Sequence, residues 1–274
     1  MTDPGRKPPR AVLLALRQEV GFCCPVVGCG SPYLTWHHFD PPWRTEHHHR
    51  PEGMIALCRE HADKADNGSF TDDQLRKLKL EGKPRSHEVR GRFDWMRRDL
   101  LAVVGGNFFY QTPIILQLGT NPCIWFDRDE DGYLLLNFKM PTISGHSRAQ
   151  IDQNTWSVVP QVDEVVCPPS GRLVEVSYSN GDKFRAEFYD AASPDELAAR
   201  YPTSRTLDWS DDVNFPVTAV ELWETTAGTT IEFGPRFSRM PGNNIFRDCF
   251  TCGGNVAFCI NISPVDLARL FPRG

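Results

Sequence analysis

The spacing of apolar residues along this chain changes near residue 106. Before that point, apolar residues recur at intervals of three and four positions, which is typical of amphipathic helices. After it, they form short runs rich in β-branched and aromatic types, separated by Gly, Asn, Asp and Pro, which predicts strands. We therefore expect an α+β protein in three parts: a small module at 1–84, a linking basic helix at 85–105 and a β-rich domain at 106–274.

Three helices are predicted before the β-rich domain. The first covers residues 9–20 and should pack against the small module. The second begins near Asp72, because Thr71 and Gln74 have the spacing of a capping box, and it ends around residues 82–84. The third spans residues 86–103, and Gly105 and Gly106 end it. Its apolar residues at helical spacing are Val89, Phe93, Met96, Leu100 and Leu101.

The chain after residue 106 predicts a mostly antiparallel β-domain, either a sandwich or an open barrel. Asn180-Gly181 lies between two alternating runs and predicts a two-residue hairpin turn. Short helices are expected at residues 193–200 and 264–269. A short β-solenoid is the alternative architecture, since residues 106–109 and 242–246 resemble each other. The predicted strands lie within residues 112–119, 123–129, 132–140, 172–190, 218–234 and 255–263.

Composition favours a cytoplasmic protein. The 274 residues are 40% hydrophobic with a mean hydropathy of -0.40, and no apolar run reaches the ~20 residues that span a membrane. The nine Cys are an odd number, which favours a reducing compartment over a disulfide framework. Cys249 and Cys252 form a pair with no second pair nearby, so we interpret them as core or loop thiols.

Charge is distributed unevenly along the chain. Lys plus Arg outnumber Asp plus Glu by 17 to 14 in residues 1–100 and are outnumbered by 21 to 13 in the remainder. A basic run at residues 76–98 can follow a phosphate backbone, although a solvated helix face explains it almost equally well. We therefore expect DNA to contact the first part of the chain. The candidate DNA-binding residues are Arg76, Lys77, Lys79, Lys83, Arg85, Arg90 and Arg92.

The β-domain offers less chemistry. Its tryptophans fit a core or the wall of a ligand or partner pocket, and a core is the preferred interpretation. We expect this domain to act in recognition, regulation or homo-oligomer formation. The tryptophans are Trp125, Trp156, Trp209 and Trp223.

Two short-spaced pairs of Cys and His predict a structural zinc site. Cys24 and Cys29 form one pair, and Cys58 and His61 form the other. Thiolate and imidazole are the ligands that zinc prefers, and these spacings are within or close to the usual range. Cys23 adjoins the first pair, so the identity of that ligand stays open, and buried free thiols are the alternative interpretation.

Five His residues lie between these two pairs. Neutral imidazole can bind a metal or accept a proton, so a group of imidazoles beside a zinc site suggests metal-assisted hydrolysis. For the last three alone, a polar loop is the preferred interpretation. The five are His37, His38, His47, His48 and His49.

This region resembles the HNH endonucleases, which have a ββα-metal fold. The matching residues are His37, His38, Phe39 and Pro41 in the doublet segment and Leu57, Cys58, Arg59 and His61 in the closing segment. The resemblance covers roughly residues 15–80. It implies that His37 binds a catalytic divalent ion, Mg²⁺ or Mn²⁺, and that His38 is the base that activates water for attack on a DNA phosphodiester.

The chain departs from the HNH pattern at two positions. Gly53 stands where the pattern has its central Asn, and Ala62 stands where it has its final His. Another group must then complete the catalytic metal site, and we expect His49, with Asp63 as the second choice. The preferred function is a metal-dependent DNA endonuclease. The alternatives are a non-catalytic zinc module that binds DNA, and an interaction protein that acts through the β-domain.

Overall fold

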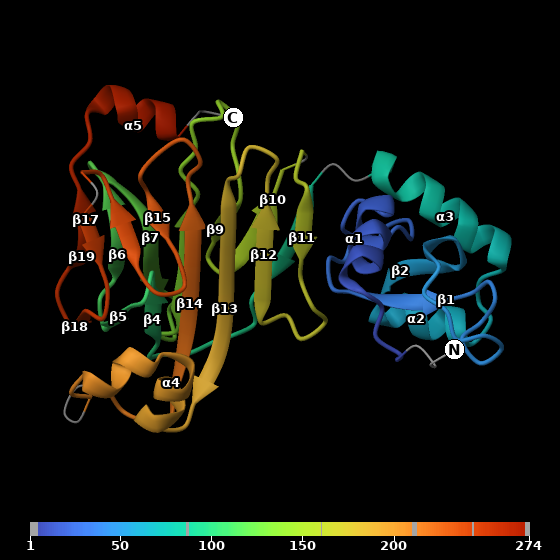
Figure 1. The fold of residues 1–274 in the computed structure, drawn as a ribbon, viewed down its shortest axis with the longest axis horizontal. Helices are drawn as coiled ribbons and strands as arrows, with labels where there is room; N and C mark the ends of the chain where they lie inside the picture. Colours follow the sequence, from blue (N-terminus) through green and yellow to red (C-terminus); the bar gives the residue numbers. More distant parts are fainter. Residues whose placement is uncertain (1–4, 86–87, 160, 210–212, 243, 272–274) are drawn as a thin grey trace. The chain divides into compact units, whose positions relative to one another are not determined.

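The computed structural model describes residues 5–85, 88–159, 161–209, 213–242 and 244–271. The chain divides into two compact units, the first formed by residues 1–91 and 157–171 and the second by residues 92–156 and 172–274. The described residues form a mixed α+β structure of sheets and five α-helices (Figure 1). None of those helices is long and apolar enough to span a membrane.

The first unit is built on a β-hairpin that leads directly into a helix. Strands β1 and β2 pair antiparallel, with Leu34 opposite Cys58 and His38 opposite Met54, and α2 begins at the residue after β2. Helix α2 contacts both strands, whereas α1 and α3 contact β2 and each other (Figure 1). The elements of this unit are α1 (Arg10–Glu19), β1 (Leu34–His38), η1 (Pro51–Gly53), β2 (Met54–Cys58), α2 (Arg59–Asp66), α3 (Asp72–Arg85) and β11 (Glu164–Val166).

Burial in the first unit follows the sequence pattern. Every residue of β2 is buried, and Leu16 and Val20 from the first predicted helix join the same core. The helices predicted at 9–20 and from Asp72 are confirmed as α1 and α3. The capping box is also formed, because Gln74 N–H donates to Thr71 Oγ1 at 3.2 Å and Thr71 N–H donates to Gln74 Oε1 at 2.8 Å.

The second unit contains two groups of hydrogen-bonded strands, and no sheet among the described residues closes into a barrel. One group has the order β19-β6-β7-β8-β9-β10. Its members are β6 (Ile114–Leu118), β7 (Asn121–Arg128), β8 (Leu134–Lys139), β9 (Gln150–Asp152), β10 (Thr155–Val158) and β19 (Val256–Ile260).

The other group has the order β12-β13-β14-β15-β16-β17, with β4 beside β14 and β5 between β4 and β18. Helices α4 (Pro194–Arg200), η2 (Pro202–Thr206) and α5 (Pro264–Leu270) complete the unit. The strands are β4 (Leu101–Val104), β5 (Asn107–Tyr110), β12 (Leu173–Ser177), β13 (Lys183–Ala191), β14 (Val217–Thr225), β15 (Glu232–Phe233), β16 (Ser238–Met240), β17 (Asn244–Phe246) and β18 (Phe250–Cys252).

Each predicted strand segment contains at least one strand, and both short helices are formed. Pairing is mostly antiparallel, with parallel pairs at β4/β14, β5/β18 and β6/β19. The β-solenoid alternative is therefore wrong, because the coils of a solenoid stack through parallel strands. Asn243, within one of its two compared segments, lies outside the described residues.

The hairpin between β12 and β13 is confirmed, but its turn is longer than the two residues predicted. Tyr178 N–H donates to the Asp182 carbonyl at 3.0 Å, which closes a loop of Ser179, Asn180 and Gly181. Gly181 takes a positive φ of 93°, while the Asn180 side chain accepts from Asp182 N–H at 3.1 Å. Asn180 thus stabilises the loop with its side chain, and only the glycine adopts a left-handed backbone.

The helix predicted at residues 86–103 is wrong. Residues 86–87 lie outside the described residues, and the chain then forms β3 (Val89–Arg92), irregular backbone and β4. Its backbone bonds to other segments, as when Phe93 N–H donates to the Asn154 carbonyl at 2.9 Å. The helical spacing arose because separate side chains, including Phe93 and Leu100, are buried in the core.

Two of the buried carboxyl groups of the second unit, Asp182 and Glu224, have different hydrogen-bond partners. Asp182 has no exposed side-chain surface, and its Oδ2 accepts from Arg148 Nε at 3.1 Å and from Thr142 Oγ1 at 2.8 Å. Glu224 accepts from Thr226 Oγ1 through Oε1, and its Oε2 has no hydrogen-bond partner among the described residues. Burial raises the pKa of Glu224 well above its usual 4.5, because the charged form loses its hydration there.

Candidate functional site

The structure brings together the four residues predicted to bind zinc. The ligand atoms of Cys24, Cys29, Cys58 and His61 all lie within 4.8 Å of one another. Cys24 and Cys58 are buried, and the other two are partly buried. The sequence left open whether Cys23 or Cys24 is the ligand. In the structure Cys24 belongs to the group.

The distances between these donor atoms fit a tetrahedral metal. Bonds of ~2.3 Å to sulfur and ~2.0 Å to nitrogen place two ligand sulfurs about 3.8 Å apart and a sulfur and nitrogen about 3.5 Å apart. Cys29 Sγ lies 3.7 Å from Cys58 Sγ, and Cys24 Sγ lies 3.5 Å from His61 Nδ1. Cys58 Sγ is closer to His61 Nδ1, at 3.1 Å. The group could therefore hold a metal such as zinc.

Local backbone structure holds these ligands in place. Cys24 N–H donates to the Ser31 carbonyl at 2.8 Å, and Cys29 N–H donates to the Val26 carbonyl at 3.0 Å, so the loop between them is closed. Cys58 is the last residue of β2, and His61 lies in the first turn of α2. Burial raises the pKa of both Cys24 and Cys58, so their thiols are protonated at neutral pH and lose protons when they bind a metal.

The first unit also has a cavity of about 660 Å³, which is lined in part by side chains of β1 and α2. His37 and His38 are consecutive residues of β1, and both line this cavity, as do Ala62, Asp63 and Asp66 from α2. The sequence posed the question of whether two neighbouring imidazoles of a strand can serve one site. They do share one cavity at the end of the strand.

His37 contacts a carboxylate that the sequence analysis missed. Its Nδ1 lies 2.9 Å from Oδ1 of Asp66, the last residue of α2, and its ring is only 9% exposed. Asp66 follows Ala62 by four residues and so lies one helical turn further along the same face. Two neighbouring ligands of an octahedral cation at ~2.1 Å are about 3.0 Å apart, so this pair also fits a divalent ion.

His38 is held in one tautomer by the backbone. Its Nε2 lies 2.9 Å from the carbonyl oxygen of His48, and because a carbonyl can only accept, Nε2 carries the proton. Nδ1 is then the nitrogen that can accept a proton. The pKa of His38 is lowered from 6.5 to about 4, mainly by burial and also by the nearby imidazoles, while the hydrogen bond to the His48 carbonyl opposes the change.

The remaining histidines of the loop have separate roles. His48 is buried and uses both nitrogens, donating to the Pro41 carbonyl at 2.9 Å and accepting from Arg50 N–H at 3.1 Å. His49 donates to the Gly5 carbonyl at 2.7 Å, and its ring centre is 6.0 Å from that of His38. Asp66, rather than His49, is therefore the group in contact with His37.

Gly53, which stands where the HNH pattern has its central Asn, lies too close to another part of the backbone for a side chain to fit. A Cβ added to Gly53 would lie 1.8 Å from the carbonyl oxygen of Asp40, so no larger residue fits without movement of the backbone. The Gly53 carbonyl in turn accepts from Phe39 N–H at 2.9 Å and Asp40 N–H at 3.2 Å. Close backbone contact thus ties η1 to the segment that follows His38.

Several predicted DNA-binding residues are neutralised by nearby carboxylates. Arg76 pairs with Asp40 and Asp73, and Lys79 pairs with Glu19 at 3.1 Å with its side chain 12% exposed. Longer contacts join Lys77 to Glu81 at 4.0 Å and Arg92 to Asp94 at 3.8 Å. Lys83 and Arg90 are exposed, and the side chain of Arg85 lies outside what the structure describes.

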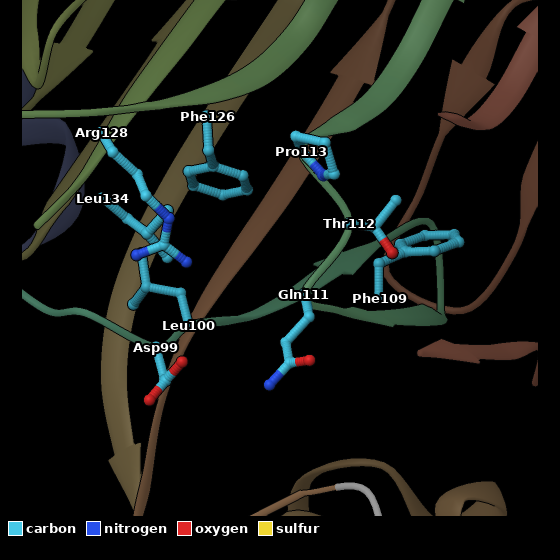
Figure 2. Close-up of a pocket in the computed structure, with 9 residues that line it drawn as sticks. All are labelled: Asp99, Leu100, Phe109, Gln111, Thr112, Pro113, Phe126, Arg128 and Leu134. Atoms are coloured by element: carbon cyan, nitrogen blue, oxygen red, sulfur yellow. The ribbon is translucent and has the colours of Figure 1, made fainter. Parts of the chain in front are cut away.

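The second unit has a smaller cavity of about 340 Å³ (Figure 2). Phe109, Phe126 and Pro113 give it an apolar wall, and Asp99 and Gln111 lie at one side of it. None of the four tryptophans considered from the sequence lines it. Two of them belong to the core, since Trp156 is 1% exposed and Trp209 is 5% exposed.

Comparison with known proteins gives no family for this chain. No family model matches it, and neither a curated protein nor a solved structure does. The functional argument therefore rests on the residues themselves.

Proposed function

We propose that this protein is a metal-dependent DNA endonuclease of the HNH type. In this proposal residues 1–84 form a zinc-stapled ββα-metal module, and the β-rich domain serves recognition, regulation or oligomer formation. The observation that carries the proposal is the shared cavity, where the His37–Asp66 pair lies beside an imidazole with a free nitrogen.

Each group has a defined task in this proposal. The Cys24, Cys29, Cys58 and His61 group holds a structural Zn²⁺, and His37 and Asp66 hold a catalytic Mg²⁺ or Mn²⁺. Asp66 takes the place that the sequence had given to His49, because it contacts His37 directly. When bound, the divalent ion supplies positive charge for the phosphate and the leaving oxygen.

His38 supplies the base. Its Nδ1 takes a proton from a water molecule while the water oxygen bonds to phosphorus. The bond from phosphorus to the leaving oxygen then breaks, and the electron pair stays on that oxygen. The hydrogen bond from Nε2 to the His48 carbonyl stabilises the ring as it becomes positively charged.

The test compares two carboxylates of the same helix. Asp66→Asn removes the charged partner of His37, whereas Glu60→Gln changes a residue of α2 that pairs with Lys64 and does not line the cavity. We expect Asp66→Asn and His38→Ala each to slow plasmid nicking in Mg²⁺ or Mn²⁺ by about 10²–10⁴-fold. Glu60→Gln should cleave like the unmodified protein, and all three variants should keep their zinc.

Binding of Mn²⁺, followed by electron paramagnetic resonance, gives a second measurement that does not depend on cleavage. We expect Asp66→Asn to weaken Mn²⁺ binding and Glu60→Gln to leave it unchanged. Undiminished nicking by His38→Ala would overturn the proposed base. DNA binding without cleavage in any divalent ion would instead favour the non-catalytic zinc module.

A further inference from the structure

Three arginines line the cavity of the first unit, and none belongs to the predicted basic run. Two of them, Arg6 and Arg44, differ from the third in their surroundings. Arg6 lies before α1, and Arg44 lies in the turn after β1, where Thr45 N–H donates to the Pro42 carbonyl at 2.8 Å. Both side chains are exposed, and no carboxylate among the described residues pairs with either. Their charges are therefore available to a ligand.

Both arginines are fixed close to His38. Arg44 follows Trp43, whose ring centre is 4.8 Å from that of His38. Arg6 follows Gly5, whose carbonyl accepts from His49, and the His49 ring centre is 6.0 Å from that of His38. Each arginine is thus next in sequence to a residue that either packs on His38, as Trp43 does, or is hydrogen-bonded to His49, as Gly5 is.

The acidic and the unpaired basic residues of this cavity come from different segments of the chain. The carboxylates come from α2 and the first residue of α3, namely Asp63, Asp66 and Asp72. The unpaired arginines come from the segments that border His38 and His49. A third arginine of the cavity, Arg59, lies 3.7 Å from Asp63 and so has a carboxylate neighbour. The carboxylates therefore suit a cation, and the unpaired arginines suit an anion.

We infer that Arg6 and Arg44 bind the phosphates of the DNA strand that enters this cavity, an inference that rests on the proposed nuclease function. Guanidinium groups recognise phosphate through paired hydrogen bonds and add a salt-sensitive electrostatic attraction. The basic residues of α3 contribute less, because Arg76 and Lys79 already pair with carboxylates of the protein. The DNA backbone is thus bound through two arginines that line the same cavity as His38.

The test measures binding of the full chain to a fluorescein-labelled DNA duplex by anisotropy, at several salt concentrations and without added divalent ions. The double variant Arg6→Gln/Arg44→Gln is compared with Arg76→Gln/Arg90→Gln, which removes the same formal charge from outside the cavity. Each lost phosphate contact lowers the slope of log K against log salt by about 0.9, so the first variant should lose about 2 from that slope. We expect its affinity to fall at least about tenfold and that of the control to change less than about threefold.

Circular dichroism and zinc content verify that both double variants remain folded, and Arg44→Lys should retain part of the binding because it keeps the charge. Equal losses in the two double variants, or a loss only in Arg76→Gln/Arg90→Gln, would overturn the inference. So would an unmodified protein that does not bind the duplex. If the cavity variant loses binding but the unmodified protein never cuts DNA, the arginine site stands and the nuclease proposal fails.

Discussion

Two groups of side chains lie on the same hairpin and helix and differ in how many donor atoms converge. One is the group of Cys24, Cys29, Cys58 and His61, and the other lines the cavity at His37. In the first, four donor atoms lie within 4.8 Å of one another, which is the full number of ligands for a tetrahedral metal. In the second, only His37 and Asp66 meet, beside about 660 Å³ of open space. Structural zinc sites are closed in this way, whereas catalytic metal sites keep positions open.

This difference teaches that ligand type alone does not separate a closed group of donor atoms from an open one. Both sites use His, and both take residues from α2. They differ in the number of protein ligands that converge and in the space beside them. If the distinction is correct, substitutions at the closed group will destroy folding, and substitutions at the open pair will not.

The largest effect is expected from Cys58→Ser. This change removes the proposed metal ligand at the junction of β2 and α2. A structural zinc ion contributes roughly 10 kcal/mol of folding free energy, so the first unit should lose both its metal and its folded structure. Metal analysis by mass spectrometry and calorimetric unfolding measure the two losses. Cys259→Ser, at an exposed thiol, is the control. A folded variant with full zinc content would show that the group is not a metal site.

Gly53→Ala should have the next largest effect, and it acts where η1 contacts the segment that follows His38. The added Cβ meets the Asp40 carbonyl at 1.8 Å, so the backbone must move, at a cost of about 2–3 kcal/mol. Urea unfolding measures that cost. Gly5→Ala has nothing within 4 Å of its Cβ and serves as the control. Loss of zinc from Gly53→Ala would contradict the separation of the two sites.

Glu224→Gln extends the comparison to a buried carboxyl group that has no ion-pair partner among the described residues. The folded-state pKa is raised, so stability is full below about pH 4.5 and falls as the pH rises, since the unfolded chain then releases the proton more readily. The neutral amide avoids this loss. We expect a stability gain of about 1–2 kcal/mol at pH 8 and little gain at pH 4.

Urea unfolding at the two pH values measures this difference. Glu130→Gln, at an exposed residue, is the control. An equal gain from Glu224→Gln at both pH values would argue against the buried proton.

The smallest effect on stability is expected from Asp66→Asn. The Asp66 side chain is 69% exposed, and exposed ion pairs contribute about 0.2–1 kcal/mol. The melting temperature should therefore change little, even though the proposed cation loses a ligand. A loss as large as that of Cys58→Ser would place Asp66 among the structural residues and remove the contrast between the two sites.

The zinc-type group was predictable because its spacing is local. Each pair lies within one loop or one turn, so the sequence alone brings Cys24 to Cys29 and Cys58 to His61. The pairing of β1 with β2 then joins the two pairs. The contact between His37 and Asp66 could not be predicted, because it depends on the direction of α2 against β1, which the core sets.

Other errors have a similar origin. The apolar spacing at residues 86–103 satisfied a helical period, but hydrogen bonds to distant segments selected extended backbone. The basic run was visible in the sequence, whereas Asp40, which pairs with Arg76, and Glu19, which pairs with Lys79, come from other parts of the chain. Charge is a property of the sequence, but the partner of a charge is a property of the fold.

Helix α2 is eight residues long, with His61 in its first turn and Asp66 at its last residue. So short a helix is marginal by itself, and its direction is set by what holds its ends. We therefore expect the Cys and His group at the first turn of α2 and the core along its length to fix the helix together, which keeps Asp66 within reach of His37. By thermodynamic reciprocity, if a metal held by His61 and the thiols strengthens cation binding at His37 and Asp66, then a cation bound there strengthens metal binding at the opposite end of the helix by the same factor.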